Sequence, residues 1–149
     1  IPGLGEAEFL RFGSIHRNAY LNSPAALGPA LTARDDDRLF FAGQLTGVEG
    51  YTESLGTGLL AGINLARRLA GKDASVPPPT TMLGALYRYL READPKHFQP
   101  MNANFGLVEV DGRTEGRKGG KGPRMSKADR KERMAEIALA DLREWMRDL

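Results

Sequence analysis

Residues 40–69, with the sequence FFAGQLTGVEGYTESLGTGLLAGINLARRL, constrain the fold more than any other part of the chain. They predict a short buried strand, a glycine-rich loop and a helix that opens on small residues. This order brings backbone N–H groups and a helix N-terminus to one place, where a ligand can bind. A tight turn in any α/β domain would have the same order without a ligand.

The glycines of this stretch do not decide between the two interpretations. Gly56, Gly58 and Gly62 miss the strict G-x-G-x-x-G spacing, because three residues separate the last two, and only the looser form ending in Ala61 fits. The loop before them alternates glycine with polar residues over 43–51, which is longer than a plain turn requires. That length favours ligand binding.

Further elements are predicted from the periodicity of hydrophobic residues and from the residues that typically begin or end helices and strands. We expect two short strands around Gly13 within 7–22, a buried strand at 38–42 and another strand at 104–110. A helix is predicted at 54–70 with Gly71 just past its end, a second one capped by Thr80 or Thr81, and a third from Ser126. The apolar positions that follow the helical period in the first of these helices are Leu55, Leu59, Ile63, Ala66 and Leu69.

Composition excludes several classes of protein. Hydrophobic residues make up 41% and charged residues 27% of the 149, which is typical of a globular domain. No apolar run approaches the ~20 residues of a membrane span, so no membrane partner is expected, and nothing indicates secretion. Cys is absent, and neither His has ligand spacing around it, so we predict no metal site and a cytoplasmic location. A first residue other than Met favours a piece of a larger protein.

Charge is unevenly distributed. The formal net charge is +2, yet 113–133 holds nine basic and three acidic residues, a net +6 that leaves −4 for the remainder. A solvated flexible segment is one interpretation and contact with nucleic-acid phosphates is the other. The candidate RNA contacts are Arg117, Lys118, Lys121 and Arg124.

Three separated motifs carry a family resemblance. They are IPGLGEAEFLRFGSIHRNAYLNSP, then FFAGQLTGVEGYTESLGTGLLAGINLARRL, then FQPMNANFGLVEV. In this order they resemble the C-terminal third of the folate-dependent tRNA (uracil-5-)-methyltransferases, the TrmFO family, over residues 1–110. The central motif also looks like the related GidA/MnmG flavoproteins, whereas HRN and PMNANFGL favour TrmFO.

The resemblance implies an α/β fold of two domains. Residues 1–75 would be the C-terminal portion of a glutathione-reductase-like FAD-binding fold, with active-site strands. Residues 76–112 would return as a helix and strand to a second α/β domain, and 113–149 would be a basic flexible segment with an amphipathic helix.

The resemblance also implies an activity. The family methylates C5 of a T-loop uridine in tRNA, with methylenetetrahydrofolate as carbon donor, reduced FAD as hydride donor and NAD(P)H regenerating the flavin. Its catalytic cysteines and its N-terminal FAD motif lie upstream, so we expect no catalytic residue here and an inactive segment that needs the remainder of its own polypeptide. The alternatives are FAD-dependent modification of another tRNA or rRNA uridine, a non-catalytic RNA-binding fragment, and an FAD oxidoreductase with a small-molecule substrate.

Carried over by residue, the resemblance assigns two sites. The residues expected beside FAD are Gly43, Gln44, Gly47, Val48, Glu49, Gly50 and Tyr51. The residues expected to bind folate are His16, Arg17 and Asn18, with the His16 ring packed on the pterin.

Overall fold

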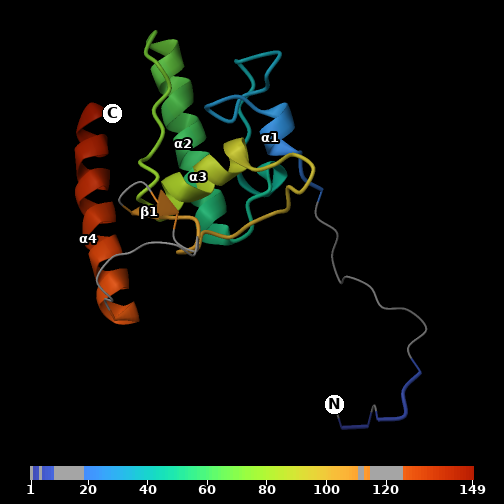
Figure 1. Cartoon of the computed structure of the whole chain (residues 1–149). Helices are drawn as coiled ribbons and strands as arrows, with labels where there is room; N and C mark the ends of the chain where they lie inside the picture. Colours follow the sequence, from blue (N-terminus) through green and yellow to red (C-terminus); the bar gives the residue numbers. More distant parts are fainter. Residues whose placement is uncertain (1, 4, 9–18, 111–112, 115–125) are drawn as a thin grey trace.

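The computed structural model describes residues 2–3, 5–8, 19–110, 113–114 and 126–149 (Figure 1). Helices dominate this part of the chain. In order, its elements are α1 (Ser23–Ala26), the 3-10 turn η1 (Gly43–Thr46), α2 (Tyr51–Leu69), α3 (Met82–Glu92), β1 (Glu109–Val110), β2 (Arg113–Thr114), α4 (Lys127–Trp145) and η2 (Met146–Asp148). Within the described residues, β1 and β2 form a two-stranded antiparallel sheet in which Glu109 lies opposite Thr114.

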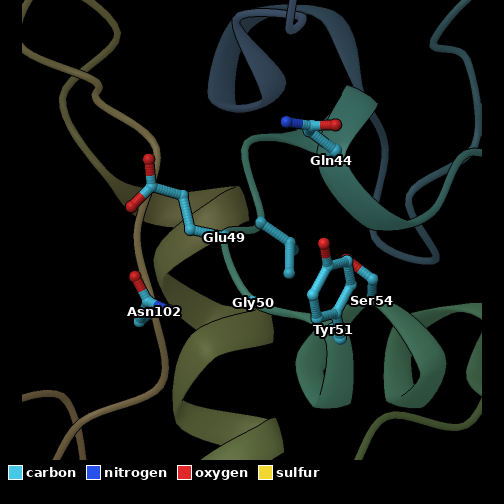
Figure 2. A pocket seen from close by; sticks show the side chains of 7 residues that line it. Gln44, Glu49, Gly50, Tyr51, Ser54 and Asn102 are labelled. Carbon is cyan, nitrogen blue, oxygen red and sulfur yellow. The ribbon is translucent and has the colours of Figure 1, made fainter. Parts of the chain in front are cut away.

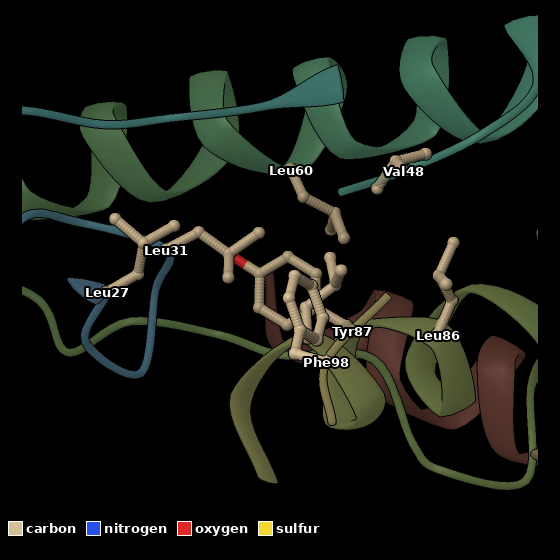
Figure 3. Close-up of a cluster of buried hydrophobic side chains, with 8 residues drawn as sticks. Leu27, Leu31, Val48, Leu60, Leu86, Tyr87 and Phe98 are labelled. Atoms are coloured by element: carbon tan, nitrogen blue, oxygen red, sulfur yellow. The ribbon is translucent and has the colours of Figure 1, made fainter. Parts of the chain in front are cut away.

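Helix α3 lies at the centre of the core. Its Leu86, Tyr87 and Leu90 are fully buried and pack with Leu60 of α2 and Phe98 (Figure 3). The Thr81 side chain caps the helix by accepting a hydrogen bond from Gly84 N at 2.9 Å. The predicted helix and its threonine cap are therefore confirmed.

Helix α4 packs against the opposite side of α3. Its Met134 joins Ala85 and Val108 in a second buried cluster, and Trp145 Nε1 donates to Ser75 Oγ at 2.8 Å. Ser126 caps the helix by accepting from Asp129 N, as the sequence predicts.

Helix α2 begins three residues before its predicted start. Gly71, with φ +70°, follows its C-terminus as predicted. The apolar period does not mark its buried face, because Leu55, Leu59 and Leu69 are exposed. The buried residues are instead Thr57, Leu60 and Asn64.

Polar residues lie inward on α2 because the helix packs against loops whose N–H groups need acceptors. Thr57 Oγ1 accepts from Gly43 N at 2.9 Å, and Asn64 Oδ1 accepts from Ser75 N at 2.7 Å. Such hydrogen bonds offset the cost of burying the Thr57 hydroxyl and the Asn64 amide oxygen. The spacing of hydrophobic residues in the sequence gives no signal for buried polar positions of this kind.

The predicted strands are mostly wrong where the structure describes them. Within 38–42, only an isolated antiparallel bridge joins Phe40 to Thr32, and Leu39 is exposed. This segment pairs with its own neighbour in sequence, so it is not a buried strand. At 104–110, only Glu109–Val110 is strand. Of the strands predicted around Gly13, residues 9–18 lie outside the described part, and 19–22 are not strand.

The described residues contain no helix long and apolar enough to cross a membrane. They also contain no group of three or more His, Asp or Glu side chains that could hold a metal ion.

Candidate functional site

Buried hydroxyls fix the loop that precedes α2. Thr46 Oγ1 donates to Gly43 O at 2.8 Å, and Ser23 Oγ donates to Thr46 O at the same distance. Thr57 of α2 accepts from Gly43 N, so η1 is tied to the helix at one end and to α1 at the other. Because these hydroxyls have almost no solvent access, the loop is held rigidly.

A distant segment joins this loop. Met101 N donates to Gly47 O at 2.9 Å and Glu49 N donates to Met101 O at 3.0 Å, which forms a short parallel bridge. The Phe98 ring lies over Gly47, where an added Cβ would come within 2.6 Å of it. Two of the three sequence motifs therefore meet at this point.

The N-terminus of α2 lies beside the bridge. Its N-cap is Gly50, with φ +98°, and no side chain caps it. The positive φ favours glycine here, because other residues rarely adopt this backbone conformation. Glu53 Oε1 accepts from Ala103 N at 3.3 Å, which ties the first turn of α2 to the segment after Met101.

A pocket of about 620 Å3 opens between these elements. Figure 2 shows Glu49 and Asn102 at the left of the pocket and Tyr51 and Ser54 at its right. Gln44 lies at the top of the same view. The lining residues are Gln44, Val48, Glu49, Gly50, Tyr51, Ser54 and Asn102. An aromatic ring, two amides, a hydroxyl and a carboxylate thus surround one space.

The character of the lining limits the ligand. Amide and hydroxyl groups can both donate and accept, and the uncapped first turn of α2 adds backbone N–H groups and the positive end of a helix dipole. Among the described residues, the lining contains no Lys or Arg, and Glu49 contributes negative charge. This combination suits the polar edge of a planar heterocycle better than a phosphate, for which paired cations are typical.

The predicted cofactor residues gather around this pocket, with two exceptions. Gln44, Val48, Glu49, Gly50 and Tyr51 line it, whereas Gly43 and Gly47 lie behind it as turn residues with positive φ.

Sequence reasoning assigned no role to Ser54 or Asn102. Asn102 lies within the quoted PMNANFGL motif, which was the only signal for it. The predicted folate residues His16, Arg17 and Asn18 lie outside the described residues, as do the predicted RNA contacts Arg117, Lys118, Lys121 and Arg124.

Known proteins match the chain closely. A family model described as "Glucose inhibited division protein A" matches residues 1–73. A protein of Geobacter sulfurreducens named methylenetetrahydrofolate–tRNA-(uracil-5-)-methyltransferase TrmFO is 51% identical over 146 residues, which is 98% of this chain. A protein of the same name from Streptococcus gordonii is 49% identical over 98% of the chain. The chain belongs to the TrmFO family.

The match covers only part of each relative. The chain spans 31% of the Geobacter sulfurreducens and Streptococcus gordonii TrmFO proteins. A TrmFO of Pelotomaculum thermopropionicum is 61% identical over 107 residues, which is 72% of this chain and 24% of that relative. The pocket is therefore part of a segment about a third as long as these TrmFO proteins.

Proposed function

We propose that this chain is the flavin-binding C-terminal segment of an FAD-dependent enzyme that methylates C5 of a T-loop uridine in tRNA. The observation that carries the proposal is the pocket at the N-terminus of α2, which two separated family motifs build together. The names of the TrmFO relatives supply the substrate class: methylenetetrahydrofolate as carbon donor and tRNA as acceptor.

The lining of the pocket supports a flavin ring as its ligand. Gln44, Ser54 and Asn102 present amide and hydroxyl groups to it, which matches the alternating donors and acceptors of an isoalloxazine edge. When bound, FAD would supply the hydride for the methyl group, with NAD(P)H as the source of electrons. Tyr51 would contact the ring, and the first-turn N–H groups of α2 would stabilise negative charge on it.

The rest of the chemistry requires the rest of the polypeptide. The chain contains no cysteine, so the covalent activation of uracil that the family uses would come from residues outside it. On this proposal, residues 1–75 complete a glutathione-reductase-like α/β fold, 76–112 return to a second domain, and the segment alone is inactive.

Two further assignments stay predictions. His16, Arg17 and Asn18 would hold folate, and a His16→Ala variant of the complete enzyme that kept its folate affinity would refute this. Arg117, Lys118, Lys121 and Arg124 would contact tRNA phosphates, which predicts binding that weakens steeply with salt.

The family-model match favours one alternative. The match to a "Glucose inhibited division protein A" model over residues 1–73 supports a related flavoprotein that modifies another tRNA or rRNA uridine. Mapping the modified position in the tRNA separates this alternative from the first proposal.

The test uses a joined polypeptide, in which this chain replaces the matched stretch of the Geobacter sulfurreducens TrmFO. We expect it to form 5-methyluridine from methylenetetrahydrofolate and tRNA. Gln44→Ala should lower the rate about tenfold, as expected for one lost hydrogen bond to the cofactor. Gln99→Ala, an exposed glutamine outside the pocket, is the matched control. Equal rates for the two variants would contradict the role of the pocket.

A further inference from the structure

The outward face of α2 has the wrong composition for a surface exposed to water. Its large exposed side chains are Tyr51, Leu55, Leu59, Leu65 and Leu69. Leu55 and Leu59 lie one helical turn apart and are 76% and 66% exposed. Single exposed leucines are ordinary, but a row of them along one helix indicates a covered surface.

Helix α4 supplies the internal comparison, since it has the same length of 19 residues. It carries ten charged residues, as expected for a helix with one side in water. Helix α2 carries three, Glu53, Arg67 and Arg68, so the whole stretch 54–66 is uncharged. A helix that lacks charge around its circumference is normally buried on all sides.

Two glycines add an independent observation. Gly58 and Gly62 are four residues apart on the outward side, and a Cβ at either position would have no atom within 4 Å. Glycine is unfavourable within a helix, and nothing in the described fold requires it at these two positions. Close approach by another backbone would explain both.

We infer that this outward face, defined by Tyr51, Leu55, Gly58, Leu59 and Gly62, packs against an apolar segment of the same polypeptide that lies outside these 149 residues. The length of the relatives supports this occupant: the chain spans 31% of the Geobacter sulfurreducens TrmFO, which leaves 69% of that protein available. The glycine pair selects a helix or strand whose backbone can come close.

The outward face also extends to the pocket. Tyr51 is 93% exposed, begins the outward face and lines the pocket. A segment that covered the face would therefore continue to the pocket and close one side of it. The exposure and composition of this face are the same whichever ligand the pocket binds.

Cysteine labelling tests the inference, because the chain has no native cysteine. Leu59→Cys on α2 is compared with Leu139→Cys, a matched control at a leucine 52% exposed on α4. In the 149-residue chain both variants should react with a maleimide at similar rates. In the joined polypeptide, peptide mass spectrometry should find the thiol of Leu59→Cys protected at least about tenfold more than that of Leu139→Cys, because labelling then requires local opening. Equal labelling there would overturn the inference.

Sedimentation of the 149-residue chain gives a second, independent reading. If the face belongs to another part of the polypeptide, the chain should sediment as a monomer at micromolar concentration. A dimer that Leu59→Lys dissociates and Leu139→Lys does not would overturn the inference in favour of a second copy. Neither measurement uses flavin or methylation, so failure of the proposed function leaves both readings intact.

Discussion

Helices α2 and α3 pack against each other, yet they differ in how their sequences relate to capping and burial. In α3 the large buried side chains Leu86, Tyr87 and Leu90 follow the helical period, and a threonine side chain caps the helix. In α2 no side chain caps the N-terminus, the inward face is partly polar and several leucines lie outward. Local rules are commonly broken where a sequence serves a ligand or a partner, so the difference indicates that α3 supports the fold and α2 serves the site.

Replacing a buried leucine of α3 and an exposed leucine of α2 should give the largest difference in the free energy of unfolding. Leu86→Ala on α3 should lower the free energy of unfolding by about 2–5 kcal/mol, because Leu86 has no exposed surface and its loss leaves a cavity. Leu55→Ala on α2 should change it by no more than about 0.5 kcal/mol. Urea unfolding of the 149-residue chain measures both. A similar cost at Leu55 would mean that its side chain is already covered.

A pH titration sharpens the description of α3. Burial raises the pKa of Tyr87 to about 12. In the unfolded chain the same group has a pKa of 10.0, so it loses its proton at lower pH than in the folded chain. The stability that neutral Tyr87 contributes is therefore intact below pH 10 and declines as the pH rises to about 12. The decline should be about 1.4 kcal/mol per pH unit.

Tyr87→Phe isolates this effect, since all other titrating groups are common to both proteins. Thermal unfolding from about pH 9 to about pH 12, the range that spans both tyrosine pKa values, should show a shallower alkaline decline in the variant. Parallel curves would mean that Tyr87 ionises in the folded chain as readily as in the unfolded one.

Glycine-to-alanine substitutions should have opposite signs in the two helices. At Gly84 of α3 an added Cβ would overlap the backbone oxygen of Pro78, so Gly84→Ala should destabilise the chain by about 1–3 kcal/mol. At Gly58 of α2 the space is open, so Gly58→Ala should stabilise the isolated chain by up to about 1 kcal/mol. Melting temperatures test the pair, and the same sign at both positions would contradict the comparison.

The same contrast explains what the sequence predicts well. The starts of α3 and α4 follow from Thr81 and Ser126, because a cap is a local interaction between residues three apart. The inward face of α2 could not be predicted, since Thr57 and Asn64 are buried by hydrogen bonds to Gly43 and Ser75 from elsewhere in the chain. The prediction of a buried strand at 38–42 was wrong because such a strand needs neighbouring strands on both sides, and the described residues do not supply them.

The candidate site divides in the same way. The glycine-rich loop before α2 is a local pattern that favours ligand binding, and the family resemblance then assigned Gln44, Glu49 and Tyr51 to the cofactor. Asn102 reaches the pocket through contacts between residues far apart in sequence, which are the bridge between Val48 and Met101 and the hydrogen bond from Ala103 N to Glu53. Pairing of this kind depends on tertiary structure and has no periodic signal.

The flavin affinity of the joined polypeptide decides whether the pocket at the N-terminus of α2 holds the flavin. Asn102→Ala should raise the Kd for FAD about tenfold, the effect of about 1.4 kcal/mol from a lost hydrogen bond, and Gln99→Ala should leave it unchanged. Titration followed by flavin fluorescence measures both. An unchanged Kd for Asn102→Ala, and for Gln44→Ala beside it, would contradict binding of the flavin in this pocket.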